Sequence, residues 1–261
     1  QGYGEACDDG NLKPGDGCSM TCTVEYHEPG EIIVSEFMSD PTKVNDEIGE
    51  WFEVYNTTEG DIDINGWMIT DNNDNPHTIT SEVPVIVPAG GYLALTLTCD
   101  AATNGGITPG YCYGGDVVDD EVNPGVFLNN SEDALSIHWN GVVIDAVVYD
   151  EVTGWLLDSG ASLQLNVEAL DGTLNDDAQS WCLSVAPYGD GDLGTPGEAN
   201  SDCGCVEGEA CDDMNACTTD DVCVAGECVG GGTLSCDTGC SCTEATRRPD
   251  NPSVLAALDS R

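Results

Sequence analysis

The chain has 261 residues, with 49 acidic side chains, 5 basic ones and a formal net charge of −44. Counterion release at a nucleic acid requires clustered lysine and arginine, so this composition excludes nucleic acid as an electrostatic partner and disfavours an anionic membrane surface. An acidic excess of this size repels itself in a compact state. Bound divalent cations, high external salt or strong packing would offset it, and a solvated acidic surface explains the total charge equally well.

Cysteine is the second unusual feature of the composition, because the chain has 15 cysteines but only 3 histidines. So many thiols are rare in a reducing cytosol, and zinc, which often takes histidine together with cysteine, is a poor second explanation. We therefore expect disulfides and export from the cell. The sequence contains no signal peptide and no apolar run long enough to span a membrane. We accordingly expect a mature form or a fragment, without direct membrane insertion.

Residues 1–29 form a short first segment that is rich in Asp, Gly and Asn and cannot build a core alone. Residues 30–200 differ sharply, because apolar and polar side chains alternate there with the two-residue period of half-buried strands. Asn-Gly pairs at 65–66 and 140–141 are strong local signals for hairpins. Seven or more such strands without an amphipathic helix predict a β-sandwich. The clearest runs cover residues 31–37, 51–55, 61–65, 91–98, 134–139 and 142–149.

The C-terminal part divides into two further segments. Residues 201–242 contain nine cysteines and are predicted to form a small disulfide-rich module. Residues 243–261 form a polar tail, interrupted by proline, with one short apolar run at 254–258. We expect this tail to be either disordered or a single docking helix.

Seven short segments of the chain follow one another in a characteristic order. They are residues 30–38 (GEIIVSEFM), 49–56 (GEWFEVYN), 61–67 (DIDINGW), 87–92 (VPAGGY), 145–149 (DAVVY), 160–163 (GASL) and 194–200 (GTPGEAN). In this order they resemble a lamin-tail domain of the kind that bacteria export. The resemblance covers about two-thirds of the chain and implies an immunoglobulin-like β-sandwich for attachment and architecture, without catalytic residues of its own. The insertion from Cys99 to Asp120 departs from the short form of the family.

The flanking segments resemble short extracellular repeats. Residues 4–25, with Cys7-Asp8-Asp9-Gly10-Asn11 at their centre, are similar to a cysteine-rich repeat of myxobacterial-type surface proteins. That repeat opens with one more cysteine, upstream of where this chain begins. Residues 211–230 are similar to another such repeat, in which Met214 replaces the usual glycine.

The cysteines divide into three groups along the chain, and their odd number leaves at least one thiol without an intrachain partner. Cys99 and Cys112 close a short loop and are the natural pair, worth roughly 3 kcal/mol by chain entropy. Cys182 reaches most easily to Cys203 or Cys205, which leaves enough C-terminal cysteines for four more bridges. The C-terminal group is Cys203, Cys205, Cys211, Cys217, Cys223, Cys228, Cys236, Cys240 and Cys242.

The N-terminal group, Cys7, Cys18 and Cys22, allows one bridge and leaves one cysteine over. The repeat that this segment resembles implies that the partner of the remaining cysteine lay upstream of Gln1. An intermolecular disulfide is the alternative.

Two acidic clusters of similar sequence lie near opposite ends of the chain, and both are candidate calcium sites. Calcium takes six to eight oxygen ligands from carboxylates, amides and backbone carbonyls, which short Asp and Asn side chains on a pinned turn can supply. The alternative is that these are turn residues with local hydrogen bonds only. We expect loops 71–75 and 190–192 to be turns. The candidate ligands are Asp8, Asp9, Asn11 and Asp16 in the first cluster, and Asp212, Asp213, Asn215, Asp220 and Asp221 in the second.

Aromatic and histidine side chains give little support for a sugar site or for catalysis. Trp51, Trp67 and Trp181 are expected in the core, whereas the positions of Trp139 and Trp155 stay open. His138 is predicted to face solvent on the strand face opposite Ile137. The sequence also carries two glycosylation-type sequons, at Asn56 and Asn129, which matter only in a host with that machinery.

No nucleophile elbow, phosphate loop or zinc-protease motif is present, so we do not expect an enzyme. We expect a structural or adhesive subunit of an extracellular bacterial assembly such as a filament or sheath, whose partner is itself or another cell-surface protein. The alternatives are a non-catalytic accessory region of a larger secreted hydrolase and a calcium-dependent enzyme.

Overall fold

The computed structural model describes residues 26–72, 76–114, 126–201, 203–204, 218–220, 222–224 and 227–233. The chain divides into two compact units, Gln1–Cys203 and Gly204–Arg261. In the second unit, β15 (Thr218–Thr219) pairs with β18 (Gly232–Thr233), and β16 (Val222–Val224) pairs with β17 (Glu227–Val229).

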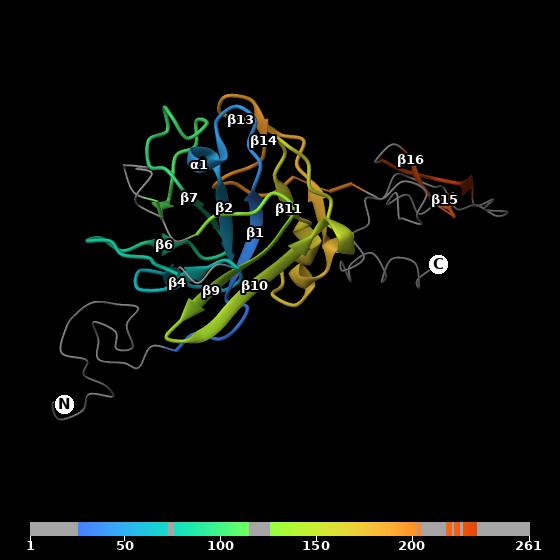
Figure 1. Ribbon diagram of the computed structural model, residues 1–261. Helices are drawn as coiled ribbons and strands as arrows, with labels where there is room; N and C mark the ends of the chain where they lie inside the picture. The colour runs from blue at the N-terminus through green and yellow to red at the C-terminus, as the bar shows by residue number, and fades with distance from the viewer. Residues whose placement is uncertain are drawn as a thin grey trace. The chain divides into compact units, whose positions relative to one another are not determined.

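The first unit is built around two β-sheets (Figure 1), which confirms the prediction of an all-β, immunoglobulin-like sandwich. The larger sheet has the order β12 (Trp181–Leu183), β11 (Leu163–Leu165), β1 (Ile32–Met38), β2 (Trp51–Asn56), β7 (Tyr92–Thr96) and β8 (Tyr111–Cys112). The smaller sheet has the order β10 (Val142–Asp150), β9 (Glu132–Trp139), β4 (Met68–Thr70) and β5 (His77–Thr78). All these neighbours are antiparallel except β7 and β8.

Short elements complete this unit. Two small strand pairs are β3 (Ile62–Asp63) with β6 (Ile86–Val87), and β13 (Pro187–Tyr188) with β14 (Asp192–Leu193). The helical turns are α1 (Asp46–Gly49), η1 (Glu151–Thr153), η2 (Val167–Ala169), η3 (Leu174–Asp176) and η4 (Ala178–Ser180).

The two Asn-Gly pairs behave differently. At 140–141 both residues have positive φ, 46° and 80°, and the turn joins β9 to β10 with Trp139 opposite Val142. This is the predicted two-residue hairpin, which needs left-handed backbone at both positions. At 65–66 the prediction of a hairpin is wrong, because the turn carries the chain from β3, which pairs with β6, to β4 in the smaller sheet. A local turn signal does not specify the sheet that the next strand joins.

All five tryptophans are buried. Trp67, Trp139, Trp155 and Trp181 belong to the main core between the sheets, and Trp51 packs in a smaller cluster with Met38. The expectation for Trp51, Trp67 and Trp181 is confirmed, and the open positions Trp139 and Trp155 prove to be core as well. The tryptophans therefore form no exposed platform for a sugar.

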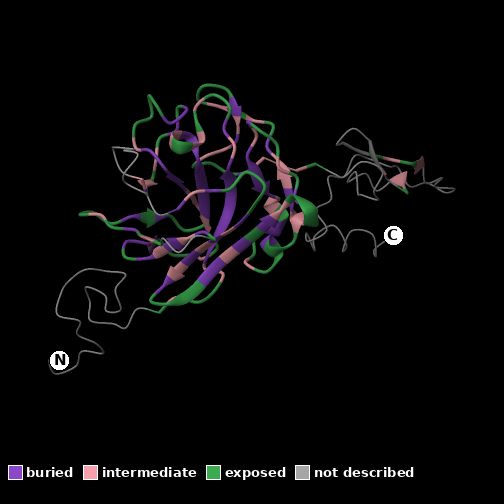
Figure 2. Ribbon diagram, in the orientation of Figure 1, coloured by how far each residue is buried: buried purple, intermediate pink, exposed green. Residues whose placement is uncertain are grey.

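Strand β1 departs from the predicted half-buried pattern, since all seven of its residues are buried (Figure 2). Its outer face is covered by residues 194–200, which bond to two carboxylates on adjacent strands. The Thr195 backbone N–H donates to Glu36 at 2.9 Å, and the Gly197 N–H donates to Glu53 at 2.7 Å. Asn200 Nδ2 donates to the carbonyls of Ser35 and Leu165. A polar face of β1 is thus enclosed by hydrogen-bond donors rather than left in water.

Two disulfides lie within the described residues. Cys99–Cys112, with 5.3 Å between the Cα atoms, confirms the pair predicted from spacing and ties the loop after β7 to β8. Cys182–Cys203, at 5.6 Å, decides between the two partners considered for Cys182. In the second unit the backbone register places Cys223 opposite Cys228. The other predicted disulfide cysteines lie outside the described residues: Cys7, Cys18, Cys22, Cys205, Cys211, Cys217, Cys236, Cys240 and Cys242.

Candidate functional site

The sandwich has four sheet edges, and they differ greatly in length. The edges at β12, β8 and β5 have three, two and two residues. Two of these short edges also carry a disulfide, at Cys182 and Cys112. Strand β10 has nine residues, and β9 is its only neighbour among the described strands. An edge strand presents unpaired N–H and C=O groups that another chain can pair with, so β10 is the candidate interaction edge.

Apolar side chains are exposed along this edge and just beyond it. Val147 and Tyr149 point into the core, whereas Val143 is 47% exposed and Val148 63% exposed. In the segment that follows β10, Val152 is 92% exposed and Leu156 63% exposed. Protected edges usually carry charged side chains instead. The C-terminal half of β10 therefore offers both backbone groups and apolar surface.

The N-terminal half of β10 is built differently, because the register shifts between Val143 and Asp145 in a β-bulge. The bulge turns Asp145 inward, where the Val34 N–H of the opposite sheet donates to Oδ2 at 2.7 Å. Asn175 Nδ2 donates to the same oxygen at 2.8 Å. Burial raises the pKa of Asp145 to about 7, although both hydrogen bonds favour the ionised form. Asp145 thus links the two sheets. This is a structural role for the first residue of segment 145–149, one of the seven segments that resemble a lamin-tail domain.

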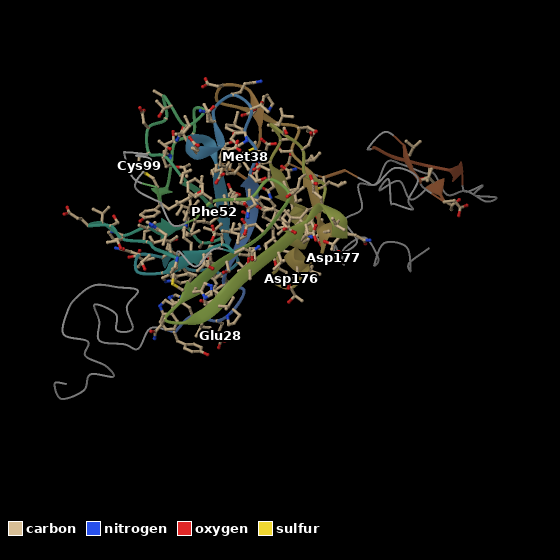
Figure 3. All side chains as sticks on the ribbon, viewed as in Figure 1. Glu28, Met38, Phe52, Cys99, Asp176 and Asp177 are labelled. Carbon is tan, nitrogen blue, oxygen red and sulfur yellow. A yellow bond between two sulfur atoms is a disulfide. The ribbon has the colours of Figure 1, made fainter. Side chains whose placement is uncertain are left out.

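A cleft of about 410 Å³ opens beside this half of the strand, and we call it the β10 cleft. Its walls are residues 29–30 with Thr57, residues 143–146 of β10, and residues 170–173 with Asp176. Figure 3 shows Asp176 beside β10. Gly172 allows two walls of the cleft to approach each other closely: a Cβ atom there would lie 3.0 Å from Gly30 Cα and 3.4 Å from Asp145 Oδ1.

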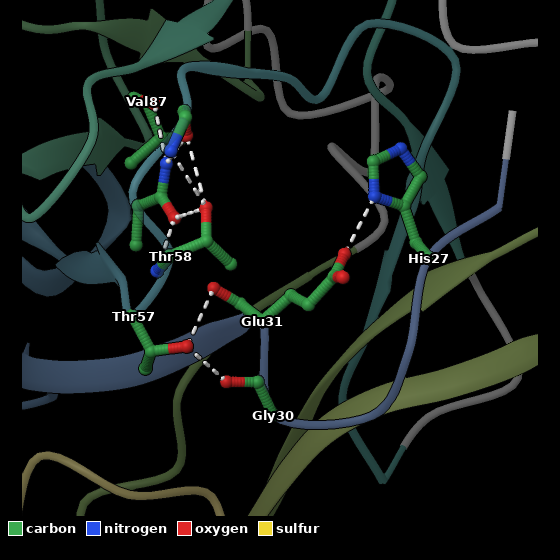
Figure 4. Close-up of polar contacts among 8 residues, drawn as sticks. His27, Gly30, Glu31, Thr57, Thr58 and Val87 are labelled. Carbon is green, nitrogen blue, oxygen red and sulfur yellow. Dashed lines mark hydrogen bonds and ion pairs between the residues drawn. The ribbon is translucent and has the colours of Figure 1, made fainter.

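One wall of the β10 cleft is fixed by a hydroxyl group (Figure 4). Thr57 Oγ1 donates to the carbonyls of Gly30, at 2.7 Å, and Glu31, at 3.2 Å. Gly30 in turn donates its N–H to the carbonyl of Ile144 at 2.8 Å. The N-terminal half of the β10 edge is therefore already contacted by the chain itself, and the open part begins at Ala146.

The β10 cleft is acidic. Asp145, Asp171 and Asp176 line it, and Lys43 is the only lysine or arginine within the described residues. Backbone hydrogen bonds from Thr173 and Leu174 lower the pKa of Asp171, so this carboxylate is ionised at neutral pH. Partial burial raises the pKa of Asp176. Such a cleft favours a guest that carries positive charge.

Nucleophilic chemistry has little support in this cleft. Its described lining contains no serine, cysteine or histidine, so the hydroxyl of Thr173 has no imidazole base among the lining residues, and the hydroxyl of Thr57 is engaged with two carbonyls. Asp145 holds the two sheets together through Oδ2. The arrangement is suited to binding.

Most of the predicted calcium ligands cannot be placed, because Asp8, Asp9, Asn11, Asp16, Asp212, Asp213, Asn215 and Asp221 lie outside the described residues. Asp220 is described and lies exposed in a turn with φ 55°. Within the described ranges, no group of three or more His, Cys, Asp or Glu side chains is placed to bind a metal ion. Calcium binding stays a prediction for the two terminal clusters.

The loop at 190–192 has a structural role, as expected for a turn. Asp192 is buried and accepts hydrogen bonds from the N–H groups of Thr42 and Lys43, both at 3.1 Å. In the loop at 71–75, Asp71 accepts the N–H of Phe127 at 2.8 Å, and residues 73–75 lie outside the described residues.

The remaining sequence candidates can also be placed. His138 lies on the face opposite Ile137, as predicted, but it is half-buried and bonds to Ser136 Oγ at 2.8 Å. The sequon residue Asn56 is buried, and its Nδ2 donates to Gly60 O and Val87 O, so it is inaccessible in the folded chain. Asn129, in the second sequon, is exposed.

A family model described as Lamin Tail Domain matches residues 26–158, just over half of the chain. The chain belongs to the lamin tail domain family. The matched residues include both strands of the β9–β10 hairpin and two of the three walls of the β10 cleft. In the structure the lamin tail domain continues past the matched residues, because β11 and β12 extend the larger sheet beside β1. No curated protein matches the chain.

The part of the chain that the structure describes contains no helix that is both long and apolar enough to cross a membrane. The comparisons and the geometry together describe a lamin tail domain with one long open sheet edge.

Proposed function

We propose that this chain is a structural or adhesive subunit outside the bacterial cell, and that its copies or partners join at the edge of β10. An immunoglobulin-like lamin tail domain fits a non-catalytic binding or structural role. The observation that carries the finer proposal is the nine-residue edge strand with its exposed valines. Addition of a strand to an open edge is a common way for chains to join.

The disulfides support a location outside the cytosol. Two bridges lie within the described residues, and the chain contains 15 cysteines in all. Disulfides persist in oxidising compartments and are rare in the cytosol. The bacterial surface is proposed from the sequence resemblance described above.

Calcium is the second part of the proposal. The two terminal clusters, around Asp8 and Asp212, supply closely spaced oxygen ligands in a chain with a net charge of −44. A ligand that binds only the folded state must stabilise it. We therefore expect calcium to raise the melting temperature of the full chain and a chelator to lower it again. A melting temperature that does not respond to calcium would contradict calcium binding by the folded chain.

The assembly is tested by sedimentation velocity and negative-stain microscopy of the full chain. We expect concentration-dependent assembly of the wild type and its loss in Val148→Glu, which places a charge on the open edge. The control is Val185→Glu, at a side chain that is 75% exposed and lies outside the edge. If Val148→Glu assembles as well as the wild type, β10 is not the interface.

An accessory region of a larger secreted hydrolase is the alternative function. A wild-type chain that stays monomeric at all concentrations, with and without calcium, would favour it over the subunit. In that case the β10 edge would serve binding within the larger protein.

A further inference from the structure

We infer that the edge of β10 and the β10 cleft bind the C-terminal tail, residues 243–261, of a second copy of this chain. The inference rests on the proposed function and names the segment that occupies the edge. It is carried by the charge of the cleft, by the part of the edge that is free, and by the composition of the tail.

The positive charge of its arginines makes the tail the best candidate among the segments of the chain to bind the acidic β10 cleft. The β10 cleft presents Asp145, Asp171 and Asp176 without a basic neighbour among the described residues. The whole chain has only 5 lysines and arginines, and 3 of them, Arg247, Arg248 and Arg261, lie in the tail. Arginine pairs with carboxylates through two parallel hydrogen bonds. Within a chain of net charge −44, the tail is the segment that complements this cleft.

The geometry of β10 disfavours the simplest alternative, which is pairing of two β10 strands along their whole length. The bulge between Val143 and Asp145 interrupts the ladder, and Gly30 already bonds to Ile144. A bulge and an inward-pointing charge are features that natural proteins use against edge-to-edge pairing. What remains is the stretch from Ala146 to Asp150, which suits a short segment that enters from the cleft.

The sequence of the tail suits both parts of this site, the acidic cleft and the open edge of β10. Pro249 and Pro252 bias the residues before them, Arg248 and Asn251, towards extended backbone. The apolar run at 254–258 follows, and it begins six residues after Arg248. At about 3.3 Å per residue, six extended residues span roughly 20 Å, which is slightly more than the extended stretch from Asp145 to the end of β10 at Asp150, where η1 follows. With the arginine pair in the cleft, residues 249–253 would therefore lie along the strand beside Val148, and the apolar run would cover the exposed side chains of Val152 and Leu156.

A complementation experiment on full chains tests this inference. One variant, Arg247→Gln/Arg248→Gln, keeps the edge and weakens the tail, and the other, Val148→Glu/Asp176→Asn, keeps the tail and blocks the site. We expect each variant alone to sediment as a monomer and their equimolar mixture to form a dimer that dissociates with added salt. Salt sensitivity is expected because the contact pairs arginine with the exposed carboxylates of Asp171 and Asp176.

Three outcomes separate the inference from the proposed function. If the tail variant alone assembles like the wild type while Val148→Glu does not, the edge is the interface but the tail is not its occupant. The inference is also overturned if the two variants stay monomeric when mixed. If Val148→Glu itself assembles, the proposed function fails and the inference fails with it.

Direct binding provides a second measurement. A fluorescently labelled synthetic peptide of residues 243–261 is titrated with the full-length Arg247→Gln/Arg248→Gln chain, whose own tail competes less. We expect saturable binding that weakens at least tenfold when Asp176→Asn is added to this chain. The control is Glu168→Gln, which removes the same charge at an exposed position that does not line the cleft. Equal binding by both variants would contradict the site.

Discussion

Buried carboxylates without a basic partner are the unusual residues of this lamin tail domain. Glu36, Glu50, Glu53 and Asp145 are all buried, and N–H and O–H groups bond to them in place of cations. Burial raises the pKa of Glu50 to about 9 and that of Glu36 to about 7, and it also raises the pKa of Glu53. Hydrogen bonds from neutral donors satisfy the oxygens but do not replace the lost hydration of the charge.

Glu50 gives the sharpest prediction for a single residue. Its Oε2 accepts the Leu128 N–H at 2.9 Å, a bond that the amide oxygen of Gln can also accept. We expect the stability of Glu50→Gln relative to the wild type to increase by on the order of 3 kcal/mol from pH 6.5 to pH 9, because Glu50 of the wild type titrates over this range whereas Gln does not. The measurement is the melting temperature of both chains at the two pH values.

Glu47→Gln is the matched control, since Glu47 is exposed on the same short helix, α1. It should leave the melting temperature unchanged at either pH. A stability difference between Glu50→Gln and the wild type that is the same at both pH values would show that Glu50 does not titrate over this range.

Among the structural elements, the segment at 194–200 closes the outer face of the larger sheet. Its backbone N–H groups reach Glu36 on β1 and Glu53 on β2, and Asn200 bonds to the carbonyls of Ser35 and Leu165. The last segment of the sequence pattern thus bonds to β1, β2 and β11. These hydrogen bonds explain why a segment rich in Gly, Thr, Glu and Asn can pack against buried strands.

Asn200→Ala removes the donor from two buried carbonyl groups. A buried polar group left without a partner costs about 1–3 kcal/mol, so we expect a loss of about 2 kcal/mol in the free energy of unfolding by urea. Asn130→Ala serves as control, because Asn130 is exposed and its side chain donates to Asp46 at 3.2 Å, a bond on the surface of the described part of the chain. Equal effects of both substitutions would show that the bonds of Asn200 add no stability.

Local patterns predicted the elements well. The alternation at 134–139 and 142–149, with Asn140-Gly141 between, predicts the β9–β10 hairpin, although not the bulge between Val143 and Asp145. The spacing of Cys99 and Cys112 predicts their disulfide. In each case the signal and the structure that it specifies lie within a few residues of each other.

Properties that depend on distant residues were not predictable in this way. Alternation marks β10 as a strand, but its position at an edge depends on which strands β9 pairs with. The burial of Glu36 depends on Thr195, which lies 159 residues further along the chain. The β10 cleft joins residues 29–30, 143–146 and 170–176, and each of these stretches looks like an ordinary turn or strand in the sequence.

At the scale of the whole molecule, stability should fall as the pH rises. The pKa values of Glu36, Asp145 and Glu50 are raised in the folded state to about 7, 7 and 9, so this state binds more protons than the unfolded chain. Their stabilising effect is complete below the unfolded pKa of about 4 and is lost as the pH rises through the folded values. Burial lowers the pKa values of His77 and His138, which oppose this trend only below about pH 6.5.

The comparison is therefore made between pH 6.5 and pH 9, where the histidines contribute little. Titration of Glu50 alone changes the free energy of unfolding by on the order of 3 kcal/mol over this range, which corresponds to a fall of roughly 5–10 °C in melting temperature. Circular dichroism at constant ionic strength gives the measurement. A melting temperature that is constant or rises towards pH 9 would contradict the assignment of raised pKa values.

The free half of β10 is the proposed meeting place of two copies of the chain. Hydrogen–deuterium exchange of the full chain, measured in dilute monomeric and in concentrated solution, tests it most directly. We predict slower exchange in concentrated solution for the amides from Ala146 to Asp150, with unchanged exchange around Val185 as the internal reference. Unchanged exchange along β10, together with protection at another surface of an assembled chain, would contradict the claim.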